Sequence, residues 1–147
     1  MDIVHFDENI DSLTLHEIKR VFNLCFGGVA DAAILDKAKG LHRLNGLLAF
    51  FDGDLVGFKL GYQKAEGVFF SWIGGVLPDF RRRGIARILM AEQYKYVLSH
   101  GYTEIQTEVS SLNPGMLILN LEEGFMVTDC QHLESGECIL LLRKKCT

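Results

Sequence analysis

The chain has 147 residues, of which 48% are hydrophobic and 23% charged, and its formal net charge is −4 at pH 7. We assign residues 1–147 to one globular domain of mixed α/β class. The acidic balance argues against a nucleic-acid partner and is compatible with a cationic amine substrate. The sequence has no basic-then-apolar leader and no apolar run of membrane-spanning length, so we expect a cytoplasmic protein without a membrane partner.

The N-terminal part predicts a strand and two helices. A strand over Asp2–Phe6 precedes a helix whose start we place at Thr14, because Thr14 and Glu17 have the spacing of a capping box. Apolar residues follow at helical intervals up to the glycine pair 27–28. The segment 29–39 predicts a second helix after this break.

A hairpin and a buried strand come next. Leu47–Phe51 and Leu55–Gly61 flank an Asp-Gly turn, which typically joins antiparallel strands. Val68–Leu77 is apolar without alternation, as expected of a central strand covered on both faces. Within it, Gly74 and Gly75 predict either a bulge or a close approach of another group to the backbone.

The remaining elements are marked by caps. A helix from Ile85 ends at Gly101, and the next helix has Asn113 as its N-cap and closes at Gly124. A strand over Thr103–Val109 separates these helices, and two more follow, roughly at 125–132 and 138–144. This order predicts a mixed, mostly antiparallel sheet of about seven strands with helices on both faces.

The segment after the central strand is the strongest functional signal. A basic turn opens directly into a helix, so its backbone N–H groups point outward at the positive end of the helix dipole. Gly84 and Ala86 leave no bulk that would keep a phosphate away. The turn therefore predicts an anion cradle, formed by Arg81, Arg82, Arg83, Gly84, Ile85 and Ala86. The alternative is a turn with solvated arginines.

This turn resembles the pyrophosphate loop of the Gcn5-related N-acetyltransferase (GNAT) superfamily, and the element order resembles that superfamily over essentially the whole chain. Asn113 through the Gly124–Phe125 pair resembles its last helix and following strand. The resemblance implies an acetyl-CoA cosubstrate, held by the cradle, by backbone at Val76 and Leu77, and by Asn113 and Asn120. It also implies transfer of the acetyl group to a primary amine by direct attack.

Two candidate catalytic residues follow from the resemblance. Asn120 stands where many members carry a tyrosine that protonates the departing thiolate, and an amide can hydrogen-bond there but cannot act as an acid. Its alternative role is a surface polar residue. Glu108, five residues before Asn113, is the candidate base that deprotonates the amine, although a glutamate on this strand is also compatible with a purely structural role. Water-relayed deprotonation stays open.

Partners and function class follow from the same residues. The resemblance implies that the acceptor of the acetyl group is a small-molecule or peptide amine. Three aromatic residues of the central strand are either walls of an acceptor pocket or simply core residues: Phe69, Phe70 and Trp72. A homodimer stays open. The alternative function is a non-catalytic acyl-CoA-binding module. We expect no metal, because the cysteines lack the close paired spacing of a zinc site; these are Cys25, Cys130, Cys138 and Cys146.

Overall fold

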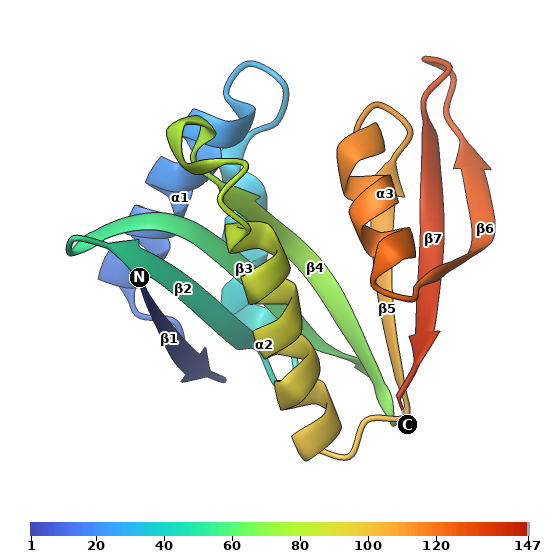
Figure 1. The fold of residues 1–147 in the computed structure, drawn as a ribbon, viewed down its shortest axis with the longest axis horizontal. Helices are drawn as coiled ribbons and strands as arrows, with labels where there is room; N and C mark the ends of the chain where they lie inside the picture. Colours follow the sequence, from blue (N-terminus) through green and yellow to red (C-terminus); the bar gives the residue numbers. More distant parts are fainter. Residues whose placement is uncertain (147) are drawn as a thin grey trace.

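The computed structural model describes residues 1–146 and contains a seven-stranded sheet in the order β1-β2-β3-β4-β5-β7-β6. All neighbouring strands are antiparallel except β4 and β5, which are parallel (Figure 1). The predicted mixed, mostly antiparallel sheet is therefore confirmed. The elements are β1 (Asp2–Asp7), α1 (Ser12–Phe26), the 3₁₀ helix η1 (Ala32–Gly40), β2 (Asn45–Phe51), β3 (Asp54–Ala65), β4 (Val68–Val76), the 3₁₀ turn η2 (Pro78–Phe80), α2 (Ile85–Ser99), β5 (Glu104–Ser110), α3 (Pro114–Glu122), β6 (Met126–His132) and β7 (Cys138–Lys145).

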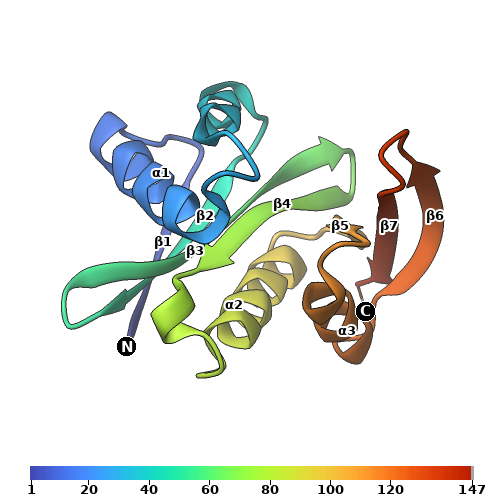
Figure 2. The ribbon, with the colours of Figure 1, turned by 90° about the horizontal axis from the view of Figure 1, so that it is seen from above.

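Helices cover both faces of the sheet, as the element order predicted. Figure 2 shows α1 and η1 on one face and α2 and α3 on the other. Phe58 of β3 is fully buried on the α1 side, and Phe69 of β4 is fully buried on the α2 side. Each buried aromatic ring contributes about 1.5–3 kcal/mol relative to an exposed one. None of the helices within residues 1–146 has the length and apolar character needed to cross a membrane.

The first two helices differ from the sequence expectation. α1 is capped by Asp11, whose carboxylate accepts a hydrogen bond from the Thr14 N–H at 2.7 Å, so the prediction that Thr14 is the cap was wrong. Asp11 supplies the same cap chemistry three residues upstream, so the helix begins about one turn earlier than predicted. The second helix has 3₁₀ geometry and begins at Ala32, where Asp31 caps it.

The predicted hairpin is confirmed, with Asp52 and Gly53 both at positive φ in its turn. Of the two alternatives predicted for Gly74–Gly75, the structure shows close approach and places the bulge nearby, before these glycines. The register between β3 and β4 shifts between the pairs Leu60↔Ile73 and Gly61↔Ser71, which leaves Trp72 as the extra residue. The glycines serve close approach instead, since a Cβ on Gly75 would lie 3.2 Å from the Cys25 sulfur.

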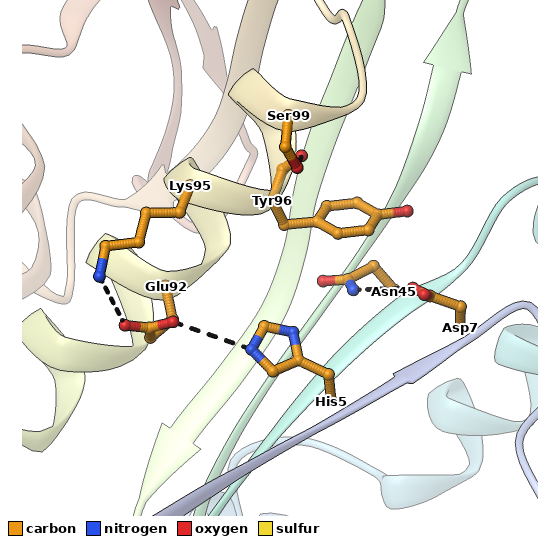
Figure 3. Close-up of polar contacts among 7 residues, drawn as sticks. All are labelled: His5, Asp7, Asn45, Glu92, Lys95, Tyr96 and Ser99. Atoms are coloured by element: carbon orange, nitrogen blue, oxygen red, sulfur yellow. Dashed lines mark hydrogen bonds and ion pairs between the residues drawn. The ribbon is translucent and has the colours of Figure 1, made fainter.

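Figure 3 shows polar contacts at the N-terminal edge of the sheet, one of which joins β1 to α2. The His5 ring of β1 lies 3.8 Å from the Glu92 carboxylate of α2, which also pairs with Lys95. Beside this pair, the Asn45 amide donates to the Asp7 carboxylate at 3.0 Å. Among these contacts, the His5–Glu92 pair is the one that joins the sheet to α2, and such exposed pairs are weak. The position of α2 therefore depends mainly on the packing of its buried Ile85 and Leu89 against the sheet.

Candidate functional site

The central strands separate part of the way along the sheet. β4 and β5 pair from Val68↔Glu104 to Ser71↔Thr107 and then diverge, as their paths in Figure 1 show. At the last pair the buried Thr107 hydroxyl donates to the Ser71 carbonyl at 2.9 Å. The bulged Trp72 is the next residue of β4. Because a bulge bends and twists its strand, it accounts for the separation beginning here.

A cleft of about 790 Å³ occupies the opening and extends to the N-terminus of α2. This volume lies within the range of small-molecule sites. Most of the predicted site residues line it: Val76, Arg81, Arg82, Gly84, Ile85, Ala86, Glu108, Asn113 and Asn120. Leu77 and Arg83 do not. The Leu77 N–H is already committed to the Val56 carbonyl at 2.8 Å.

The turn before α2 has the geometry of an anion cradle. The backbone N–H groups from Arg82 to Arg87 have no acceptor within residues 1–146, and the first helical bond is that of Ile88 to the Gly84 carbonyl. Arg82 and Gly84 have positive φ values of 62° and 77°, a backbone pattern that turns successive N–H groups into a concavity. A Cβ on Gly84 would meet no atom within 4 Å, so the space beside this backbone is open to a phosphate.

The arginines of the turn have different surroundings. Arg81 donates from Nε to the Val76 carbonyl at 3.1 Å, which ties the turn to the end of β4. The Arg83 guanidinium lies 4.9 Å from the centre of the Phe80 ring. Arg87 pairs with the carboxylates of Glu122 and Glu123 at the C-terminal end of α3. Arg81 and Arg82 are both exposed and line the cleft, and Arg82 has no side-chain partner within residues 1–146.

Asn120 is 5% exposed and lines the cleft from α3, so the alternative of a surface polar residue is wrong. Its Nδ2 donates to the Met116 carbonyl one turn earlier at 2.8 Å. This bond orients the amide, and the Asn120 oxygen remains available as an acceptor. The Asn113 side chain caps α3 by accepting from the Met116 N–H at 3.2 Å.

Glu108 is the first residue of β5 after its last pair with β4, and it is exposed where the cleft opens. Burial, together with the nearby Glu108 carboxylate, raises the pKa of the Tyr62 phenol. Tyr62 also packs on Phe70 and Trp72, with ring centres 5.6 and 6.3 Å apart. A carboxylate beside aromatic rings is a suitable environment for a cationic amine.

Phe69 does not belong to this aromatic group. It lies on the opposite face of β4, where its ring packs against Tyr96 and Tyr102 at 5.9 and 5.3 Å. Phe69 is therefore a core residue, whereas Phe70 and Trp72 remain candidate walls of an acceptor pocket. The alternation of side chains along a strand separates neighbours in this way.

Two cleft residues were missed by the sequence analysis. Lys59 of β3 lines the cleft, and the available signal was a lysine between Phe58 and Leu60 in an otherwise apolar strand. Cys25 lies at the end of α1, where its thiol donates to the Val76 carbonyl at 3.2 Å. Burial raises the pKa of this thiol. Nothing in its local sequence distinguished it from an ordinary helix residue.

Three side chains with metal-ligating atoms meet on the hairpin of β6 and β7, outside the residues that line the cleft. They are Cys130, His132 and Cys138, whose ligand atoms lie within 4.8 Å of one another. The His132 ring turns Nδ1 toward Cys138 at 3.1 Å and Nε2 toward Cys130 at 3.9 Å. Sequence spacing did not reveal this group because its members come from two strands.

The structure combines a splayed sheet of mixed α/β class with a helix N-terminus whose N–H groups have no acceptor within residues 1–146. A model of the Acetyltransferase (GNAT) family matches residues 15–119, which is more than half of the chain. The chain belongs to this family, and the resemblance inferred from the sequence motifs is confirmed.

A curated relative and solved structures agree with this assignment. The L-2,4-diaminobutyric acid acetyltransferase of Nocardia farcinica is 33% identical over 75 residues, which are 50% of this chain and 39% of that protein. The ribosomal-protein-S18-alanine N-acetyltransferase of Escherichia coli superposes with a TM-score of 0.83 at 14% identity, over 98% of this chain and 95% of the other. An aminoglycoside 6'-N-acetyltransferase complexed with coenzyme A superposes with a TM-score of 0.78 at 14% identity, over 100% of this chain and 98% of the other.

Proposed function

We propose that this protein is an acetyl-CoA-dependent N-acetyltransferase that acetylates a primary amine by direct attack. The observation that carries the proposal is the continuity of the cradle and the cleft: free N–H groups at the start of α2 open into the gap between β4 and β5. A pyrophosphate with a long flexible arm fits this arrangement, with the anion at the helix terminus and the arm in the gap. The matched segment covers only 39% of the diaminobutyrate enzyme, so its substrate is not carried over.

Acetyl-CoA would supply the acetyl group as a thioester. The N–H groups from Arg82 to Arg87 and the Arg82 side chain would bind the pyrophosphate. Backbone groups of β4 from Trp72 to Val76, which β5 leaves unpaired, would bind the pantetheine amides. The Asn120 oxygen would accept a hydrogen bond from the same arm.

Glu108 would hold and deprotonate the amine. Glu108 follows Thr107 directly, so it lies beside the closed end of the gap, on the face of the sheet that also carries Tyr62, Phe70 and Trp72. An ammonium ion is attracted to a carboxylate and to aromatic faces, but only the neutral amine attacks a carbonyl. A base beside the closed end of the gap, acting directly or through one water, would produce the neutral amine there.

The names of similar proteins support an amine acceptor without specifying one, since they include a diamino acid, a protein N-terminal alanine and an aminoglycoside. We retain a small molecule or a protein N-terminus as the acceptor. A cytoplasmic location and a homodimer stay predictions.

A non-catalytic acyl-CoA-binding module is the second candidate, favoured by the asparagine at position 120 in place of an acid. An amine panel with acetyl-CoA, followed by thiol release, tests the choice. Thiol release that depends on one class of amine supports the enzyme. Tight binding of coenzyme A without release for any amine supports the binding module, and failure to bind coenzyme A rejects both.

A further inference from the structure

A lysine lies in the cleft on the face of the sheet that α2 covers. Lys59 pairs across the sheet with Gly74 of β4. A Cβ built on Gly74 would lie 3.4 Å from the Lys59 Cγ, so the aliphatic stem of Lys59 lies over the glycine. Because Gly74 has no side chain, the stem can cross β4 toward the edge that β5 leaves unpaired, and Lys59 lines the cleft there.

Lys59 is half-buried, and its strand position has apolar neighbours. Leu47 and Gly74 are its cross-strand neighbours, and Leu89 and Met90 of α2 line the same cleft. Burial lowers the pKa of Lys59 to about 8, with no charged group among its causes. The titratable side chains that line this cleft are Cys25, Arg81, Arg82, Arg87 and Glu108. Because an isolated buried charge is unfavourable, a lysine kept here is well suited to a negative charge brought by a ligand.

The position of Lys59 along the cleft indicates which part of a ligand it meets. The cradle lies just beyond Val76, and the gap closes at Ser71. Gly74 lies between them, about 10 Å from the closed end at roughly 3.3 Å per residue. A coenzyme A anchored by its pyrophosphate would extend its thiol end past Val76 toward the closed end, and hence past Lys59.

We propose that the Lys59 ammonium is the group that stabilises and protonates the thiolate of the departing coenzyme A. This rests on the proposed function. As the amine nitrogen bonds to the acetyl carbon, the carbon–sulfur bond breaks and its electron pair goes to sulfur. The proton of Lys59 then passes to sulfur, and the neutral amine of Lys59 regains a proton from solvent. The proton lost by the attacking amine goes to Glu108 or to water.

This assignment divides acid and base between the two faces of the sheet. Glu108 alternates with Val109, which packs in the core beneath α2, and therefore points to the opposite face from Lys59. Asn120 lines the cleft on the Lys59 side but has no proton to give near neutral pH. An ammonium with a pKa near that of a thiol, ordinarily about 8.5, is matched to this transfer.

The test measures the thiol of bound coenzyme A rather than turnover. The protein is saturated with coenzyme A, and the ultraviolet absorbance of the thiolate is followed as pH rises. In the unmodified protein the thiol should ionise at least one pH unit below free coenzyme A, about a tenfold larger thiolate fraction near neutral pH. In Lys59→Met the midpoint should rise to that of free coenzyme A or above. Lys95→Met, which removes an exposed lysine of α2, should behave like the unmodified protein.

A second variant separates charge from proton transfer. Lys59→Arg keeps a positive charge but cannot release a proton near neutral pH, so it should keep the lowered thiol midpoint while turnover falls at least tenfold. Coenzyme A that binds Lys59→Met with an unchanged midpoint overturns the assignment of Lys59 and leaves the proposed function standing. Coenzyme A that fails to bind the unmodified protein, by calorimetry, overturns the proposed function and this inference together.

Discussion

The Thr107 side chain closes the gap between the central strands by donating to the Ser71 carbonyl at 2.9 Å. This bond lies at the last pair of β4 and β5 and is buried. It therefore defines the deep end of the cleft that begins beside the helix N-terminus.

Thr107→Val should lower the free energy of unfolding by about 1 kcal/mol, because a buried carbonyl loses a hydrogen bond while side-chain volume is nearly preserved. Urea denaturation measures this loss. Thr103→Val is the matched control, since its hydroxyl also donates to a backbone carbonyl but at an exposed position. Equal losses in the two variants would show that burial of the Thr107 bond has no special weight.

Gly84→Val should abolish coenzyme A binding. Gly84 has a φ of 77° and open space beside it, so a branched side chain would both strain the turn and occupy the phosphate position. Gly136→Val is the control, because Gly136 also has a positive φ and open space but lies in the remote β6–β7 turn. Calorimetry should show binding lost only in the first variant. Unchanged affinity in folded Gly84→Val would remove the cradle from the mechanism.

Asn120→Ala should weaken coenzyme A binding or turnover by about 1–2 kcal/mol, the contribution of one neutral hydrogen bond in a buried site. The Asn120 amide is held by the Met116 carbonyl, so it can act as a fixed partner but not as an acid. Steady-state kinetics and calorimetry together assign the loss to binding or to turnover. A loss of several orders of magnitude with an intact fold would contradict this role.

Glu108→Gln should reduce turnover most at acidic to neutral pH, where the amine is largely protonated, and progressively less as pH rises. Glu104→Gln is the control, because Glu104 lies four residues earlier on the same strand, in its paired part. It should show the pH–rate profile of the unmodified protein. A Glu108→Gln profile that merely parallels that of the unmodified protein would leave Glu108 with a structural role.

Lys59→Met should raise the free energy of unfolding, and the gain should depend on pH. The folded-state pKa of about 8 lies below the ordinary lysine value of 10.5, so between these values the unfolded state binds more protons. The penalty of Lys59 is therefore fully present below pH 8 and fades as pH approaches 10.5. Denaturation curves across this range measure the difference. A constant difference would show that Lys59 is not held in a desolvated site.

Much of the fold could be predicted from the sequence because its determinants are local. Caps, glycine stops and the Asp-Gly turn depend on neighbouring residues, so nearly all element boundaries agreed within a few residues. The misplaced cap illustrates the limit, since Asp11 and Thr14 both satisfy cap chemistry and only the folded chain selects one. The bulge at Trp72 illustrates a second limit, because the register of β3 against β4 depends on pairing between two strands and not on one local segment.

The anion cradle could be predicted from the sequence alone, because its glycine and basic residues are contiguous from Arg81 to Ala86 and lead directly into the helix. The cleft beside the cradle could not be predicted in this way, because elements far apart in the sequence form it. Strand pairing that ends at Ser71 and Thr107 brings Glu108 and Asn120 to the same cleft. Packing on β4 places Lys59 over Gly74, where burial changes its acidity. A lysine in a strand carries no local signal of this, because desolvation depends on which elements cover it.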